Sequence, residues 1–430
     1  MTVWCERLIV DGVVRERVRL IADARGTVAD VAADVAPRDG DLLVGTAIPG
    51  AANAHSHAFH RALRGRTHDG GGDFWTWRDL MYRTAARLTP ESYGRLARAV
   101  FAEMIAAGFT AVGEFHYVHH RPDGTAYPHE MEEAIAEAAA GVGIRLTLLD
   151  TAYLAGGIGA PLSTEQTRFG DGSAEGYVRP WHELAERMPG LGAAIHSVRA
   201  VSPEDIRTIL AGLPADIPLH IHLSEQSKEN EDAVAAFGAT PTGILERAGA
   251  ITPRLSVVHA THLTDDDIRL LGAGGVSVVM CPTTEADLGD GIGPARELRD
   301  AGATLALGSD QNAVIDPLLE VRGLEMQDRL RSQRRGRFTL GELSRALGAE
   351  GYRSLGLAAP LAVGGPLDLV ELDTRSARTA GADPEQLLLC ATASDVTRVI
   401  VGGRVVAENG ALAGGERPAD LLASALEEFT

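Results

Sequence analysis

Residues 47–57 read AIPGAANAHSH, a run of small and apolar residues that ends in two histidines one position apart. Such a run is typical of a buried parallel strand, and residues two positions apart on a strand point to the same face. The side chains of His55 and His57 can therefore point to the same side of the strand and share a metal ion. The pair alone is weak evidence, because two unrelated surface histidines are the ordinary alternative.

Seven further short apolar runs follow along the chain. The predicted strands cover residues 47–55, 110–117, 144–152, 192–198, 218–223, 255–260, 276–281 and 304–308. Segments with helical periodicity, among them residues 90–107, 130–140 and 203–211, alternate with them. This alternation predicts a (β/α)8 TIM barrel, whose reactive groups gather at the carboxyl ends of the strands. A doubly wound open sheet is the alternative, but no G-x-G-x-x-G or phosphate-loop motif follows the first strand.

The two ends of the chain have a different pattern. Residues 3–35 and the residues from 366 onward are rich in β-forming runs, and Gly402-Gly403 joins two of them as in a hairpin. We interpret both termini as one small β-sandwich domain. The predicted domains are residues 1–47 plus 363–430 for the small domain and 48–362 for the metal-dependent catalytic barrel.

Composition excludes several classes of protein. The 430 residues hold 40 Lys+Arg against 59 Asp+Glu, a net charge of −19 that argues against a nucleic-acid or membrane partner. Apolar residues at 45% and charged residues at 23% are globular values. The chain starts without a secretory signal, and no apolar run reaches the ~18 residues needed to span a bilayer. We therefore expect a cytoplasmic protein.

Polar side chains recur at the ends of later predicted strands. His222 and Glu225 close the fifth strand, His259 lies in the sixth, and Asp310 ends the eighth. The same-face rule does not choose between His220 and His222, but the H-x-x-E spacing to Glu225 favours His222. Three imidazoles and one carboxylate suit Zn²⁺ or Fe²⁺ with one position open for water. The predicted metal ligands are His55, His57, His222 and Asp310.

One metal ion is expected rather than two. A second ion in such a barrel generally needs a bridging anion from the middle strands, often a carboxylated lysine. Residues 194–199 at the end of the fourth strand include no lysine or carboxylate, and the chain's one lysine, Lys228, lies outside the fifth strand.

As an ordered set, these motifs resemble the mononuclear deaminase branch of the amidohydrolase superfamily, which has a (β/α)8 barrel and a small β-sandwich formed by both termini. Within that branch the chain is similar to the formimidoylglutamate deiminases. The stretches that carry this similarity are residues 55–59 with 61–62, 74–82 (FWTWRDLMY), 114–117 (EFHY) and 281–286 (CPTTEA).

The resemblance implies an activity: hydrolytic deimination of N-formimino-L-glutamate to N-formyl-L-glutamate and ammonia, in histidine degradation. It implies a small dianionic substrate, a homodimer and Zn²⁺ or Fe²⁺ as cofactor. The catalytic residues it implies are Glu225, His259 and Asp310. The substrate-binding residues it implies are His60, Arg78, Tyr117, His196 and Arg199. His60 departs from the family, which commonly has glutamine at that position.

Three rival functions stay open on the sequence. Another deaminase of the same superfamily, acting on guanine, cytosine or a related heterocycle, would keep the metal residues and differ in the pocket. A related formimino or guanidino acid is a second possibility, because one methylene of chain length changes binding by only ~1–3 kcal/mol. A non-catalytic metal-binding barrel is the third. Arg78 and Arg199 argue against a flat neutral base, while Glu225 and His259 argue against a mere scaffold.

Overall fold

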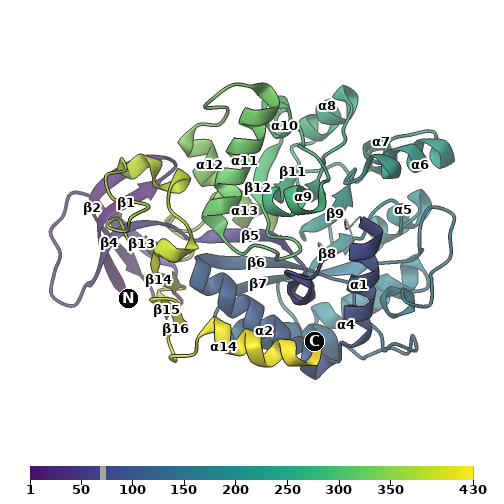
Figure 1. Ribbon diagram of the computed structural model, residues 1–430, viewed down its shortest axis with the longest axis horizontal. Helices are drawn as coiled ribbons and strands as arrows, with labels where there is room; N and C mark the ends of the chain where they lie inside the picture. Colours follow the sequence, from purple (N-terminus) through teal and green to yellow (C-terminus); the bar gives the residue numbers. More distant parts are fainter. Residues whose placement is uncertain (68–73, 430) are drawn as a thin grey trace.

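Eight parallel strands form the centre of the molecule (Figure 1). The structure is a computed structural model that describes residues 1–67 and 74–429. Each strand pairs with its neighbours along the chain, and a bridge between Ser56 and Asp310 joins the last strand to the first. This arrangement confirms the predicted barrel. Its strands are β5 (Ala51–Ser56), β6 (Phe109–His116), β7 (Arg145–Ala152), β8 (Gly192–Ile195), β9 (Leu219–Leu223), β10 (Leu255–His259), β11 (Ser277–Met280) and β12 (Thr304–Leu307).

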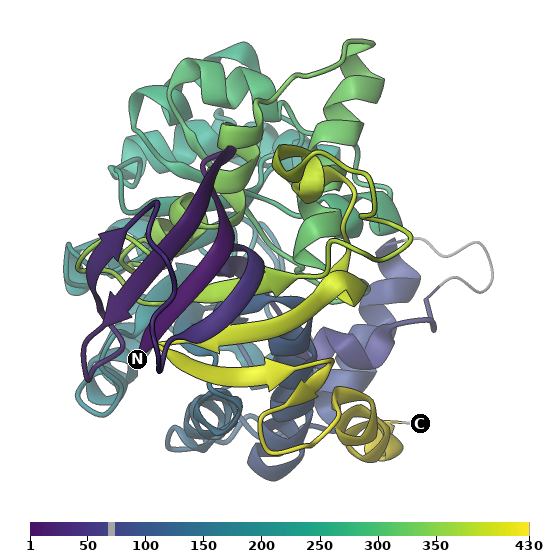
Figure 2. The same ribbon diagram turned by 90° about the vertical axis from the view of Figure 1, so that its left-hand side faces the viewer.

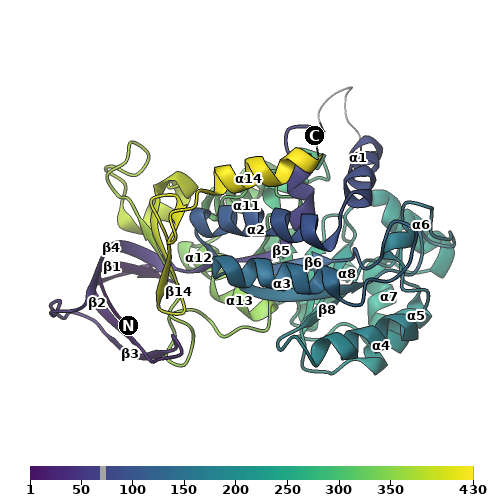
Figure 3. The same cartoon turned by 90° about the horizontal axis from the view of Figure 1, so that it is seen from below.

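Helices surround the barrel and connect its strands (Figure 3). Those between β5 and β9 are α1 (Phe74–Ala86), α2 (Pro90–Ala107), α3 (Glu130–Val142), α4 (Ala174–Ala185) and α5 (Pro203–Gly212). Those between β9 and β12 are α6 (Ser227–Phe237), α7 (Pro241–Ala248), α8 (Asp265–Ala273), α9 (Pro282–Leu288) and α10 (Ala295–Ala301). After β12 come α11 (Pro317–Ser332), α12 (Leu340–Leu347) and α13 (Ala349–Ser354).

Local sequence signals explain where these helices begin and end. The Thr89 side chain accepts a hydrogen bond from the Ser92 amide and caps α2, which carries a proline in its first turn. Ser202 caps α5 in the same way, through the amide of Asp205. Helix α2 ends at Gly108, whose φ of 107° suits a residue without a side chain. The three predicted helical segments are confirmed as α2, α3 and α5.

Strands from both termini form a second, mixed sheet beside the barrel (Figure 2). Its order is β16-β15-β14-β13-β4-β1-β2-β3, and β1 runs parallel to β4. The predicted hairpin is confirmed: β14 pairs antiparallel with β15 across Gly402 and Gly403, both at positive φ. The strands are β1 (Thr2–Val10), β2 (Val13–Ala22), β3 (Val28–Ala32), β4 (Leu42–Pro49), β13 (Leu369–Leu372), β14 (Val396–Val401), β15 (Arg404–Glu408) and β16 (Ala411–Leu412). The last helix, α14 (Pro418–Leu426), returns to lie along α2 (Figures 1 and 3).

The expected strand over residues 47–55 is wrong in one respect, because it is two strands. Residues up to Pro49 belong to β4 in the terminal sheet, and β5 of the barrel starts at Ala51. Between them, the Gly50 amide donates to the Asp368 carbonyl at 2.9 Å, and a Cβ at Gly50 would meet the Thr110 hydroxyl oxygen at 2.2 Å. The two sheets approach so closely there that the chain passes from one to the other at a glycine.

None of the helices in the described part of the chain combines the length and the apolar character that crossing a bilayer requires.

Candidate metal centre and active site

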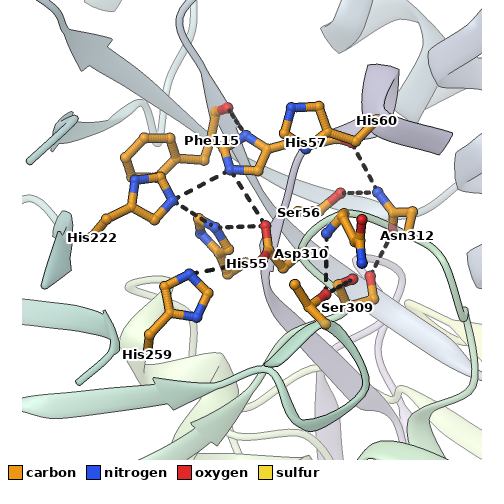
Figure 4. Close-up of polar contacts among 12 residues, drawn as sticks. His55, Ser56, His57, His60, Phe115, His222, His259, Ser309, Asp310 and Asn312 are labelled. Atoms are coloured by element: carbon orange, nitrogen blue, oxygen red, sulfur yellow. Dashed lines mark hydrogen bonds and ion pairs between the residues drawn. The ribbon is translucent and has the colours of Figure 1, made fainter. Parts of the chain in front are cut away.

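The predicted metal ligands lie together at the carboxyl end of the barrel strands (Figure 4). His55 lies in β5, His57 follows it, His222 lies in β9, and Asp310 follows β12. Two backbone hydrogen bonds join the first of these segments to the last. The Asp310 amide donates to the His55 carbonyl at 2.9 Å, and the His57 amide donates to the Asp310 carbonyl at 3.0 Å. Closure of the barrel therefore builds the centre.

The four ligand atoms face one another at short distances. His222 Nε2 lies 3.1 Å from His55 Nε2 and 3.4 Å from His57 Nε2. Asp310 Oδ1 lies 3.4 Å from His55 Nε2 and 3.6 Å from His57 Nε2. All four side chains are buried. Tetrahedral zinc with bonds of ~2.1 Å places its ligand atoms ~3.4 Å apart, so the four residues fit a divalent cation.

The chemistry of the imidazoles supports this fit. His57 Nδ1 donates to the Phe115 carbonyl at 2.9 Å, and His222 Nδ1 donates to the His196 carbonyl at 3.0 Å. Burial and the neighbouring His55 lower the pKa of His57 to about 3, and burial also lowers the pKa of His222. In these neutral rings the Nε2 atoms carry lone pairs that point at each other. Such lone pairs repel unless a cation lies between them.

His259 lies beside the Asp310 carboxylate, next to its Oδ2. Its Nε2 is 3.8 Å from Asp310 Oδ2, and its Nδ1 is 3.5 Å from Glu285 Oε1. Glu285 Oε1 also accepts the Cys281 amide at 2.9 Å, which fixes the carboxylate in place. Burial lowers the pKa of His259, but the Glu285 hydrogen bond and the carboxylates of Glu225 and Asp310 outweigh it and raise the pKa to about 10. His259 thus presents an N–H donor beside the metal position.

A buried hydrogen-bond network supports the ligands from behind. Asn312 Nδ2 donates to the His57 carbonyl at 3.0 Å and to Ser56 Oγ at 3.1 Å. Its Oδ1 accepts from Ser309 Oγ at 2.6 Å, and Asn53 Nδ2 donates to that same serine oxygen at 2.6 Å. These side chains connect β5 to the segment after β12 (Figure 4). They hold the seam of the barrel on which His55, His57 and Asp310 stand.

Strained backbone marks the same strand ends. Ser224, His259, Ala260 and Asp310 have φ of 50°, 68°, 51° and 42°, in the left-handed region that side chains with a Cβ rarely adopt. Each such residue costs of order 1–3 kcal/mol, and residues of this kind cluster at functional sites. Two of these four residues, His259 and Asp310, carry side chains that face the candidate metal position.

A cavity of about 370 Å³ opens above the metal centre. Its volume is in the range of sites for small molecules. Among the residues that line it are His57, His222 and Asp310 of the metal centre and the predicted catalytic residues Glu225 and His259. The five predicted substrate-binding residues line it too, namely His60, Arg78, Tyr117, His196 and Arg199.

The predicted substrate-binding residues come from different elements. His60 Nε2 is 3.1 Å from the Tyr117 hydroxyl, which joins the segment after β5 to the segment after β6. The His196 ring packs against Tyr153 with centroids 4.5 Å apart. Arg78, in α1, holds its guanidinium carbon 5.6 Å from the centre of the Tyr82 ring. The wall of the cavity is therefore aromatic, with cationic and hydroxyl groups set into it.

Arg199 pairs with the predicted proton carrier. Its Nη2 donates to Glu225 Oε2 at 3.2 Å, and its Nε lies 3.8 Å from Glu229 Oε2. Glu229, in the first turn of α6, was not expected from the sequence, where a glutamate near a helix start is an ordinary surface residue.

Other lining residues had no sequence signal. Gln166, in the long connection after β7, donates from Nε2 to the Tyr82 hydroxyl at 3.0 Å and to the Tyr153 hydroxyl at 2.9 Å. No motif marks this glutamine, because it acts through contacts with distant segments. His220 lies away from the metal position, with Nε2 2.9 Å from the Ser354 carbonyl.

A second histidine cluster lies outside the cavity. His116 Nε2 and His119 Nδ1 are 3.2 and 2.9 Å from Glu132 Oε1, and His119 Nε2 is 3.0 Å from the Thr151 carbonyl. Both nitrogens of His119 face acceptors, so the ring carries two protons. Burial opposes this charge, but Asp150 and Glu132 outweigh it and raise the pKa of His119 to about 10. Protonated His119 is therefore the cation of this cluster.

Comparison with known proteins gives a consistent picture. Residues 46–406 match the model of the amidohydrolase family. The chain is 38% identical over 99% of both chains to a formimidoylglutamate deiminase of Pseudomonas aeruginosa. A crystal structure of an amidohydrolase from Brucella melitensis superimposes with a TM-score of 0.92, at 32% identity over 100% of this chain and 99% of the other. A zinc-bound adenosine deaminase from Xanthomonas campestris superimposes with a TM-score of 0.82, at 25% identity over 99% and 97%.

Proposed function

We propose that this chain, which belongs to the amidohydrolase family of metal-dependent hydrolases, converts N-formimino-L-glutamate and water to N-formyl-L-glutamate and ammonia. One observation carries the proposal. The cavity above the His/Asp centre also holds two guanidinium groups, those of Arg78 and Arg199. A planar guanidinium is the side chain best suited to a carboxylate, and the proposed substrate has two carboxylates. The similarity to the Pseudomonas enzyme supports the same assignment.

We propose a single Zn²⁺ as the cofactor, with Fe²⁺ as the second choice, held by His55, His57, His222 and Asp310. When bound, such an ion lowers the pKa of a water from ~15.7 toward ~7 and so makes hydroxide available near neutral pH. Asp310 Oδ1 faces the ligand nitrogens, whereas Oδ2 points to His259. Oδ2 is therefore the oxygen placed to accept a proton from the attacking water.

His259 and Glu225 have different roles in the rest of the reaction. The oxygen attacks the formimino carbon, and the His259 N–H donates a hydrogen bond to that oxygen as its negative charge develops. Glu225 carries the proton taken from the water to the terminal nitrogen of the amidine, and the second proton of the water reaches the same nitrogen from the hydroxyl of the tetrahedral adduct as its carbonyl forms. The bond between this nitrogen and the carbon then breaks, ammonia leaves, and the glutamate nitrogen keeps its formyl group. General acid–base assistance of this kind contributes ~10²–10⁴-fold in rate.

The test is ammonia release from the zinc-loaded protein with three compounds: N-formimino-L-glutamate, guanine and cytosine. The expected result is turnover of the formimino compound at least ~10²-fold faster in kcat/KM than of either base. An Asp310→Asn variant serves as the control for metal-independent hydrolysis. Preference for a heterocycle would overturn the substrate assignment and leave the family assignment intact.

Deamination of a heterocycle is the second candidate. The aromatic wall formed by Trp77, Tyr82, Tyr153 and Phe169 offers surfaces on which a flat base could stack. The similarity to the Xanthomonas adenosine deaminase favours the same alternative. The two guanidinium groups favour the dianionic acid over it.

A further inference from the structure

Arg199 is surrounded by more negative charge than a carboxylate-binding residue should be. Two carboxylates flank it in the cavity: Glu225 at 3.2 Å and Glu229 at 3.8 Å. The Glu229 side chain is fully buried, and that of Glu225 is 11% exposed. A substrate carboxylate that approached Arg199 would bring a third negative group to one positive charge. Binding therefore requires that one of the resident carboxylates give way.

The two glutamates differ in how firmly they are held. Glu229 lies in the first turn of α6, its side chain is fully buried, and the amides of Ser224 and Glu225 act on its carboxylate from the turn before the helix. Burial raises the pKa of Glu229, while Arg199 and these amides oppose that rise. Both glutamates line the cavity, but Glu225 stands on the turn after β9, next to Ser224 with its φ of 50°, and only its side chain is partly exposed. Glu225 is thus the partner that can leave.

We propose that Arg199 exchanges partners when substrate binds: a carboxylate of the substrate replaces Glu225 on the guanidinium, and Glu229 keeps Arg199 in place throughout. The proposal rests on the proposed function, because it assumes a substrate with a carboxylate tail and Glu225 as the proton carrier. Glu229 is then a positioning residue that holds Arg199.

The exchange links recognition of the tail to proton transfer. While Glu225 is bonded to Arg199, its Oε2 accepts from the guanidinium and is held away from the reacting atoms. Once released, Glu225 is free to carry the proton that Asp310 Oδ2 has accepted from the attacking water to the departing nitrogen. The carboxylate tail therefore acts on kcat as well as on KM, because binding energy far from the reacting carbon is used to activate Glu225.

A neutral substrate separates this exchange from ordinary binding. N-Butylformamidine has the reacting amidine and lacks both carboxylates. With the zinc-loaded wild-type protein, its kcat should be ~10²-fold or more below that of N-formimino-L-glutamate, even at saturation. In Arg199→Met, Glu225 no longer has its guanidinium partner. The kcat for N-butylformamidine should then rise about 10-fold, while kcat/KM for N-formimino-L-glutamate falls.

Ordinary binding predicts a different result. If Arg199 only binds the tail, Arg199→Met leaves N-butylformamidine turnover unchanged, and this result would overturn the proposal. Lys228→Met is the matched control, because Lys228 lines the same cavity but pairs with Asp232 at 2.8 Å. It should leave the kcat for N-butylformamidine within about 2-fold of wild type, which excludes a general effect of removing a positive charge.

Two further measurements keep the test decisive. Arg199→Met leaves the Glu229 carboxylate buried without its cation, which can destabilise the fold. The double variant Arg199→Met/Glu229→Gln removes that unpaired charge, and its kcat for N-butylformamidine should rise by the same factor. A crystal structure with N-formyl-L-glutamate should show Arg199 Nη2 on the ligand carboxylate and beyond hydrogen-bond distance from Glu225. An intact pair at 3.2 Å with the ligand bound elsewhere would refute the exchange. Failure of the wild type to hydrolyse N-formimino-L-glutamate would instead refute the proposed function.

Discussion

Replacement of Asn312 by aspartate should weaken the metal centre without altering any predicted ligand. The Asn312 side chain donates to the His57 carbonyl at 3.0 Å and to Ser56 Oγ at 3.1 Å, and it accepts from Ser309 Oγ at 2.6 Å. Aspartate has the same shape and can still accept from Ser309, but it loses both donated bonds. The backbone adds no complication, because φ at this position is 57° and both residues tolerate that region.

The expected cost follows from these bonds. Ser56 can rotate its hydroxyl to donate to the new carboxylate, so losing the hydrogen bond from Asn312 Nδ2 to Ser56 Oγ costs only about 0.5–1.5 kcal/mol. The His57 carbonyl cannot donate, and it is left opposite a buried oxygen at a cost of about 1–3 kcal/mol. Together the free energy of unfolding should fall by about 1.5–4.5 kcal/mol. Because this network orients His57 and the Asp310 segment, zinc affinity should fall about 10–100-fold.

Zinc affinity is measured by competition with a chromophoric chelator, and stability is measured by urea unfolding of the metal-free protein. Asn409→Asp is the matched control. It makes the same substitution at a φ of 50°, but on an exposed turn of the terminal sheet. Zinc binding by Asn312→Asp within 2-fold of the Asn409→Asp value would refute the claim that the barrel seam holds the ligands in position.

Three further variants test other parts of the structure. Glu225→Gln should lower kcat by ~10²–10⁴-fold and retain one zinc per chain by metal analysis; near-normal turnover would remove Glu225 from proton transfer. Burial raises the pKa of Glu320 to about 8, so the folded state keeps a proton that the unfolded state releases from pH ~4.5 upward. Stability should therefore fall by up to about 1.4 kcal/mol per pH unit as pH rises to 8, and urea midpoints of Glu320→Gln should lack this share of the slope. Gly50→Ala should lower the free energy of unfolding in urea by about 1–3 kcal/mol, because the new Cβ meets Thr110 Oγ1. Gly414→Ala is the control, because its Cβ would lie in open space, and it should cost less than ~1 kcal/mol. Equal costs would contradict the close packing at Gly50.

Local patterns in the sequence were sufficient for the elements of the fold. Apolar runs predicted the barrel strands, and helical periodicity predicted the helices that the structure shows as α2, α3 and α5. The one strand predicted wrongly, over residues 47–55, shows the limit of such patterns. Its apolar residues are continuous across Gly50, and the approach of Thr110 from β6 is what divides them between two sheets.

The sequence also named the ionisable groups, but not how they pair. The resemblance pointed to Arg199 and Glu225 separately, as a substrate ligand and a proton carrier, and the structure places them 3.2 Å apart. Glu285 lay within a stretch that carried the resemblance, yet nothing local indicated that it faces His259. Side-chain pairs of this kind depend on how neighbouring strands are placed in space.

The amino-acid sequence by itself determined that alternating strands and helices form a barrel and that histidines two positions apart share one face of its first strand. This information is local, because strand geometry fixes the direction of each side chain. Only the tertiary structure decided that Asp310 closes the barrel against His55, that Asn312 supports His57, and that Glu229 stands behind Arg199. These contacts join segments far apart in the chain or in different elements. Their distances are set by the register at which the eighth strand pairs with the first and by the packing of helices on the barrel. The spacing of residues along the chain predicts neither.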